Sequence, residues 1–130
     1  MKGIIFMNNK YEVLFFEDSN GKEFISSFIE ELSEKNRARV FREIDLLENN
    51  GPALKEPHTK YLKNGIFELR ISIKESYVRI FYFYDKEKII ILTHGFMKKT
   101  KKTPVKEIKR ALNVLDLNYG SERSLEEDGG

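Results

Sequence analysis

Two arginines on consecutive predicted strands, Arg70 and Arg79, are the residues best placed to do chemistry. A turn at 74–76 sets residue 70 opposite residue 80, within one residue of register, so the two side chains are near neighbours. Their flanking residues are mostly apolar or aromatic, and an arginine there costs desolvation energy unless it meets an anion. Two interpretations follow: a structural ion pair with Glu68 or a helix carboxylate, or two guanidinium groups that clamp a phosphate.

Other basic and aromatic residues are candidates to contact the rest of a nucleic acid. A run of lysines stands just before the last predicted helix: Lys98, Lys99, Lys101 and Lys102. Such a run is typical of a solvated turn, but beside an arginine pair it also predicts a rim that binds a phosphate backbone. Lys60 and Tyr61 precede the first arginine strand, and Tyr61 either stacks on a base or packs under its loop.

His94, near the end of the last predicted strand, is a candidate for proton transfer. An imidazole titrates near neutral pH and can serve as a general acid or base. A single histidine in an apolar strand is also typical of a packed or hydrogen-bonded core residue. Both interpretations stand at this point.

The charges are unevenly distributed along the chain. Its 130 residues carry 23 Lys and Arg against 21 Asp and Glu, a net charge of +2. Residues 1–59 carry −3, residues 60–110 carry +9 and residues 111–130 carry −4. Phosphate binding needs a concentrated positive field, because Coulomb attraction and counterion release act locally. The overall balance excludes a protein that is basic all over, and the +9 block favours a phosphate ligand over a lysine-rich solvated surface.

The absence of certain residue types and motifs from the sequence excludes several kinds of functional site. The chain has no cysteine, which excludes a disulfide scaffold, a thiolate nucleophile and cysteine-ligated metal sites. It has no Gly-rich phosphate loop or HExxH pattern, and the acidic residues of 60–110 form no cluster suited to Mg²⁺. We therefore expect no metal and no cofactor. If the phosphate ligand belongs to a nucleic acid that the protein cleaves, the cleavage has to proceed without a metal. For RNA this is chemically possible, because the 2′-hydroxyl is an internal nucleophile.

The N-terminal half predicts a strand followed by a helical hairpin. Aromatic and β-branched residues at 11–16 are typical of a strand. Apolar residues at helical spacing predict helices at 22–33 and 34–49, and Asn50-Gly51-Pro52 ends the second. Residues 53–65 are interpreted as a loop.

The C-terminal half predicts three antiparallel strands, at 67–73, 77–84 and 89–97, and a last helix that begins near Pro104. The fold class is therefore α+β, in the order β-α-α-β-β-β-α, with an antiparallel sheet packed by the helical hairpin and the C-terminal helix. We expect one domain at 11–118, a leader at 1–10 and a flexible acidic tail at 119–130. The longest N-terminal apolar stretch is too short for a signal or a membrane span, which predicts a cytoplasmic protein without a membrane partner.

Three sequence motifs resemble a known family. They are Lys60-Tyr61-Leu62 followed by Gly65-Ile66-Phe67-Glu68-Leu69-Arg70; Arg79-Ile80-Phe81-Tyr82; and His94-Gly95-Phe96-Met97-Lys98-Lys99-Thr100-Lys101-Lys102-Thr103-Pro104. In combination they resemble the phage-derived HigB-like branch of the RelE/ParE toxin superfamily. The similarity spans about residues 11–117 and implies a RelE-like small sandwich.

The resemblance implies the toxin of a type II toxin–antitoxin system. Its expected activity is that of an mRNA interferase, a metal-independent endoribonuclease that cleaves mRNA on the ribosome and inhibits translation. Its expected partners are mRNA, the ribosome and a cognate helix-turn-helix antitoxin of the HigA-like kind. Two alternatives stay open: a ParE-like inhibitor of DNA gyrase, and a non-catalytic member that only binds an antitoxin or RNA.

The resemblance also implies roles for Arg70, Arg79 and the lysines at 60, 98, 99 and 102, and the chemistry of the side chains adds His94, Tyr61 and Tyr82. The candidate catalytic residues are Arg70, Arg79, His94 and Lys98. The candidate RNA-binding residues are Lys60, Tyr61, Tyr82, Lys99 and Lys102. Many RelE proteins have a catalytic tyrosine near the C-terminal end, where this chain has lysine and threonine. The proton-transfer group is therefore His94, Lys98 or Tyr82.

Overall fold

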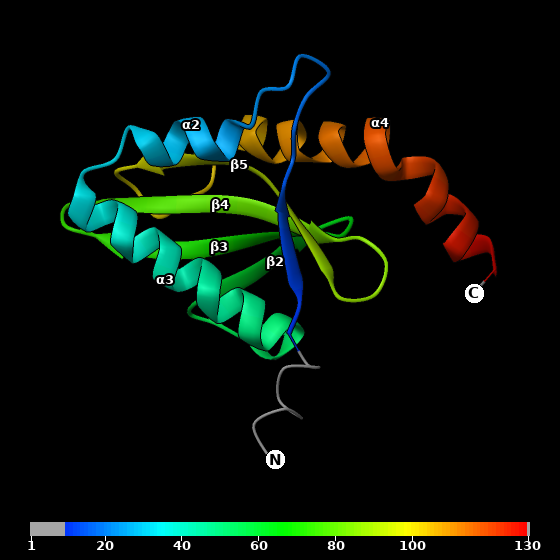
Figure 1. Ribbon diagram of the computed structural model, residues 1–130, viewed down its shortest axis with the longest axis horizontal. Coiled ribbons are helices and arrows are strands. Elements are labelled where there is room, and N and C mark those ends of the chain that lie inside the picture. Colours follow the sequence, from blue (N-terminus) through cyan, green and yellow to red (C-terminus); the bar gives the residue numbers. More distant parts are fainter. Residues whose placement is uncertain (1–9, 130) are drawn as a thin grey trace.

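The computed structural model describes residues 10–129 and contains one five-stranded sheet with helices on both of its faces (Figure 1). The strands are β1 (Glu12–Phe15), β2 (Thr59–Lys63), β3 (Ile66–Ile73), β4 (Ser76–Tyr84) and β5 (Ile89–Lys98). Their spatial order is β1-β5-β4-β3-β2; β1 runs parallel to β5 and the other neighbours are antiparallel. The predicted α+β class is confirmed.

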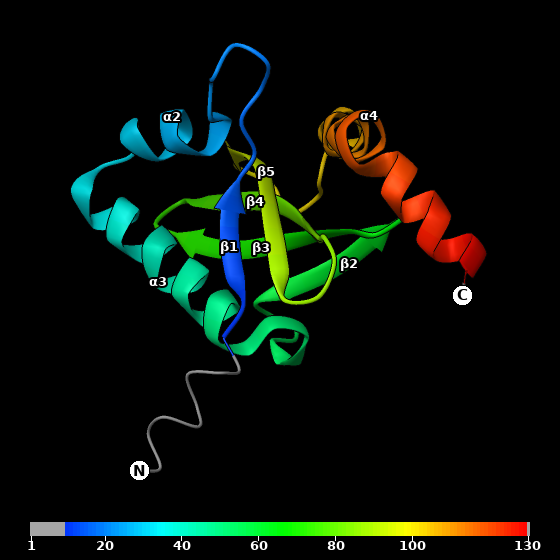
Figure 2. The same ribbon diagram turned by 45° about the vertical axis from the view of Figure 1, so that its right-hand side comes forward.

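The helices divide between the two faces of the sheet. They are α2 (Phe24–Glu30), α3 (Glu34–Asn50), the short 3-10 turn η1 (Gly51–Ala53) and α4 (Val105–Gly129). The hairpin of α2 and α3 covers one face, which we call the hairpin face, and α4 crosses the other, the α4 face (Figure 2). Two clusters of buried apolar residues therefore hold the sheet from both sides.

Alternation along the central strands supplies both clusters, because successive side chains of a strand point to opposite faces. On the hairpin face, Leu69 and Ile71 of β3 pack with Ile80 of β4 under the helical hairpin. On the α4 face, Phe81 and Phe83 of β4 pack under α4. β4 is buried along most of its length, as a sequence that is apolar at nearly every residue predicts.

The ends of α3 follow from two local signals. At its start the Ser33 side chain accepts a hydrogen bond from the Asn36 amide, which satisfies a free donor of the first turn. At its end Gly51 adopts a positive φ of 52°, and a Cβ there would clash with the Tyr11 ring. Glycine at this position therefore both ends the helix and leaves room for the ring of Tyr11, the residue before β1.

One strand differs from the predicted element order. The sequence predicts a loop at 53–65, but Thr59–Lys63 form β2, which pairs with β3 at the edge of the sheet. The two strands are joined by Asn64 and Gly65, whose φ values of 48° and 89° are both positive. This is the backbone that a two-residue hairpin requires, so the observed order is β-α-α-β-β-β-β-α.

The two predicted domain boundaries, near residues 10 and 118, can be compared with the structure. Nearly all of the predicted leader, residues 1–9, lies outside the described residues. At the other end α4 continues to Gly129, so this helix passes the boundary predicted at residue 118.

Candidate functional site

Arg70 and Arg79 lie on the α4 face, directly opposite each other on β3 and β4. The predicted register differs by one residue, with Arg70 opposite Ile80. The observed pairing matters, because residues directly opposite on antiparallel strands share a face of the sheet. Arg70 keeps 24% of its side chain exposed, whereas Arg79 keeps only 3%. The Arg70 side chain is therefore partly accessible to a ligand, whereas the Arg79 side chain beside it is buried.

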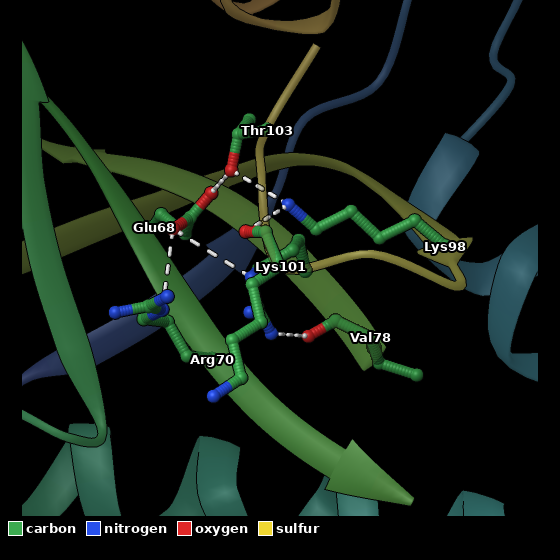
Figure 3. Close-up of polar contacts among 7 residues, drawn as sticks. Glu68, Arg70, Val78, Lys98, Lys101 and Thr103 are labelled. Carbon is green, nitrogen blue, oxygen red and sulfur yellow. Dashed lines mark hydrogen bonds and ion pairs between the residues drawn. The ribbon is translucent and has the colours of Figure 1, made fainter. Parts of the chain in front are cut away.

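Glu68 joins the two arginines. Its Oε1 atom lies 3.4 Å from Nε of Arg70 and 3.6 Å from Nε of Arg79. Its other oxygen accepts a hydrogen bond from the Thr103 hydroxyl (Figure 3). Glu68 is two residues before Arg70 on the same strand, so its side chain is on the same face, and only 1% of it is exposed. The ion pair with Glu68 that the sequence left open is present.

The guanidinium group of Arg79 is in an environment that disfavours its positive charge. Burial lowers the pKa of its guanidinium, and Glu68 opposes that effect. Its Nη1 donates a hydrogen bond to the Val78 carbonyl at 3.0 Å, and the group stands over the Tyr77 ring at 5.3 Å. Its Nε has no hydrogen-bond partner in the described part of the chain, since the approach to Glu68 is an ion pair at longer range. A ligand oxygen that reached this nitrogen would supply the hydrogen-bond acceptor that it lacks.

Lys98, the last residue of β5, closes the cluster. Its ammonium donates to the Lys101 carbonyl at 2.7 Å and to the Thr103 hydroxyl at 3.0 Å (Figure 3). Burial and the positive charges of Arg79, Arg70 and Lys60 lower its pKa to about 8, against the opposing effect of Glu68. An amine with this pKa can give up a proton near physiological pH, which ordinary lysines do not. We call Lys60, Glu68, Arg70, Arg79, Lys98 and Thr103 the arginine cluster.

The arginine cluster carries a surplus of positive charge. Its four cationic side chains face a single carboxylate. Both guanidinium groups already pair with one carboxylate oxygen, and groups of this kind bind anionic oxygens such as those of a phosphate. Chemically, it can bind a phosphate, stabilise negative charge that develops on it and transfer a proton.

Comparison with protein-family models identifies the family of the chain. The model described as "Phage derived protein Gp49-like (DUF891)" matches residues 27–116. The chain belongs to this Gp49-like family. The match runs from α2 into α4 and includes every residue of the arginine cluster. The site therefore lies in the part of the chain that carries the family relationship.

Other comparisons add little to the Gp49-like assignment. No curated protein sequence matches the chain. Among solved structures, the crystal structure of the archaeal RelE–RelB complex from Pyrococcus horikoshii OT3 matches with a TM-score of 0.46 and 15% identity. That match covers 72% of this chain and 99% of the other.

In the Gp49-like domain His94 lies inside the molecule rather than in the arginine cluster. Its Nε2 is 3.0 Å from Glu107 on α4 and its Nδ1 is 3.0 Å from the Thr93 hydroxyl. Burial, followed by the charge of Arg110, lowers its pKa to about 4, although Glu107 acts in the opposite direction. The ring is therefore neutral near pH 7 and links β5 to α4.

Lys60 of the arginine cluster and the two remaining lysine candidates, Lys99 and Lys102, are exposed. Lys60 on β2 pairs with Glu68 on β3, so the register places it on the α4 face. Lys99 and Lys102 lie in the segment between β5 and α4, next to the contacts that Lys98 makes. All three are free to reach a polyanion that is bound at the arginines.

The two tyrosine candidates lie on the opposite side of the sheet. Tyr61 pairs with Phe67, and Phe67 pairs with Tyr82, so all three rings belong to the hairpin face. Tyr82 is 1% exposed, and burial raises its pKa well above the ordinary value. The structure therefore separates Tyr61 and Tyr82 from the arginine cluster, while bringing Arg70, Arg79, Lys60 and Lys98 together.

The described residues contain no group of three or more His, Cys, Asp or Glu side chains arranged to hold a metal ion. Within the same part of the Gp49-like chain, no helix is both long and apolar enough to cross a membrane.

Proposed function

We propose that this Gp49-like protein is the toxin of a type II toxin–antitoxin system, a metal-independent endoribonuclease that cleaves mRNA on the ribosome. The proposal extends the HigB-like resemblance of the three sequence motifs. The observation that carries it is the arginine cluster: two guanidinium groups face each other across paired strands, with a lysine of lowered pKa beside them. Basic side chains and one proton-transfer group of this kind suffice for RNA cleavage without a metal.

The proposed reaction uses the 2′-hydroxyl of the RNA as nucleophile. Its oxygen forms a bond to phosphorus and releases its proton to solvent, while the bond from phosphorus to the 5′-oxygen breaks. The products are a 2′,3′-cyclic phosphate and a 5′-hydroxyl. The partly exposed Arg70 binds the phosphate oxygens, the buried Arg79 beside it adds positive charge, and the Lys98 ammonium donates the proton that the leaving 5′-oxygen needs.

Glu68 has a positioning role in this proposal. Its carboxylate pairs with both Nε atoms, so that in this proposal the terminal nitrogens of Arg70 are left to bind the phosphate. Through Thr103 it also fixes the segment that carries the lysines. The antitoxin, a helix-turn-helix protein, neutralises the toxin by covering this basic face or by adding a strand at a free edge of the sheet, β1 or β2.

The test is to induce the chain alone in bacteria and to map the ends of an abundant mRNA by primer extension. We expect growth arrest with new 5′ ends inside translated mRNA, and relief of both in Arg70→Ala. Arrest with intact transcripts and a DNA-damage response would instead identify a gyrase inhibitor. Harmless expression of the folded protein would identify a non-catalytic member.

A further inference from the structure

A cavity of about 260 Å³ lies on the hairpin face, on the other side of the sheet from Arg70 and Arg79. Its walls come from the segment after α3 and from β2, β3 and β4. The volume is below the range of about 300–1,000 Å³ that drug-sized ligands occupy. The cavity therefore suits a single planar ring system rather than a whole nucleotide.

Aromatic rings form the wall of this cavity. Tyr61 meets Phe67 edge to face, with centroids 5.0 Å apart, and Phe67 stacks on Tyr82 at 5.4 Å and 17°. Tyr61 is 55% exposed and Tyr82 is buried, so the rings lead from solvent into the molecule. An exposed ring beside a fixed one is the arrangement on which unpaired bases stack.

Lys60 connects this cavity with the arginine cluster. It lines the cavity together with Lys55 and Glu56, and it lies opposite Glu68 in the register of β2 and β3. Its charge acts on Lys98, which shows that it also belongs to the electrostatic surroundings of the arginines. Because β2 is an edge strand, no further strand separates the two sites on that side.

We propose that the cavity binds one unpaired base of the RNA strand whose phosphate binds at Arg70 and Arg79. The strand passes over the edge of β2, where Lys60 neutralises the phosphate between the two sites. The inference rests on the proposed RNA substrate and adds a base subsite to it. It also gives Tyr61 a stacking role on the face of the sheet where the structure places it.

The experiment uses the full chain and single-stranded RNA oligonucleotides in which 2-aminopurine replaces one base at a time. The fluorescence of 2-aminopurine falls when it stacks on an aromatic ring, and the chain contains no tryptophan to interfere. We expect quenching at one position, and binding that weakens roughly 5- to 150-fold in Tyr61→Leu, the effect of removing one stacked base. Tyr61→Phe should bind as the wild type does. Phe41→Leu, at an exposed ring on α3, is the matched control and should bind equally.

An abasic nucleotide at the quenched position should remove the difference between wild type and Tyr61→Leu. The inference is overturned if Tyr61→Leu binds every oligonucleotide as tightly as the wild type. It is also overturned if Tyr61→Leu loses affinity only for the antitoxin, because the cavity would then hold a protein side chain. Cleavage is measured separately: base-dependent binding without cleavage would keep the subsite and refute the nuclease.

Discussion

Arg70 and Arg79 lie opposite each other on β3 and β4, and the Nε atoms of both point to the same oxygen of Glu68. Glu68 thereby offsets part of the repulsion between two guanidinium groups that share one face of the sheet. A single buried carboxylate compensates them in part and leaves net positive charge for a ligand.

The carboxylate of Glu68 should be essential for stability. Glu68→Gln leaves the buried Arg79 without a counter-charge, and breaking a buried pair in this way costs on the order of 3 kcal/mol. We expect a lower free energy of unfolding in urea. Glu75→Gln, at an exposed turn residue, should change it little. Equal stability of Glu68→Gln and wild type would show that the carboxylate does not hold Arg79.

Lys98 should set the alkaline limit of cleavage. Its pKa of about 8 means that the ammonium, the proposed proton donor, is deprotonated as pH rises through 8. Single-turnover rates of the wild type should therefore fall above that pH. Lys98→Arg stays protonated and should cleave slowly without this fall. Lys99→Arg, at the exposed neighbour, should keep the wild-type profile; a flat wild-type profile would contradict the role of Lys98.

His94 should make the fold sensitive to acid. The folded chain keeps this imidazole neutral down to about pH 4, whereas the unfolded chain protonates it below about 6.5. Stability should thus fall between these two pH values, by an amount on the order of 2–3 kcal/mol. In His94→Gln the dependence of the unfolding free energy on pH should be shallower. His58→Gln serves as the control, and equal slopes in His94→Gln and wild type would argue against this role of the imidazole.

The exposed lysines should contribute to RNA affinity through charge alone. Lys102→Ala should weaken binding of single-stranded RNA equally for all sequences. It should also lower the slope of log K against log salt by about 0.7, the value expected for one neutralised phosphate on a single strand. Lys35→Ala, an exposed lysine on α3, should leave the slope unchanged. An unchanged slope in Lys102→Ala would place the RNA elsewhere.

Much of the fold was predictable because helices and strands bury one face at a characteristic period. Alternation in β3 and helical spacing in α3 are strong signals of this kind. β2 was not predicted because it is an edge strand with mostly exposed residues, so it shows no alternation. The Asn64-Gly65 pair was the available signal, since this dipeptide favours the positive φ values of a tight hairpin.

The candidate site was predictable where it depends on local pairing and not where it depends on irregularities. The turn between β3 and β4 brings Arg70 beside Arg79 almost by itself. The position of His94 depends on a bulge, in which Thr93 and His94 of β5 together lie against Phe81 of β4. Because of this bulge, the His94 side chain points toward α4. Without the bulge, regular alternation after Leu92 would place it on the hairpin face. Thr103 depends in turn on how the segment after β5 folds back.

The central claim is that the arginine cluster cleaves RNA through the 2′-hydroxyl. The most direct test presents purified protein with ribosomes programmed with an mRNA that carries a single 2′-deoxynucleotide at the mapped cleavage site. We predict that the all-ribose mRNA is cut to a 2′,3′-cyclic phosphate, that the substituted mRNA is not cut there, and that Arg70→Ala slows cleavage about 10²–10³-fold. Arg42→Ala, on the exposed side of α3, should cut normally. Equal cleavage of the deoxy-substituted mRNA, or a wild-type rate in Arg70→Ala, would contradict the claim.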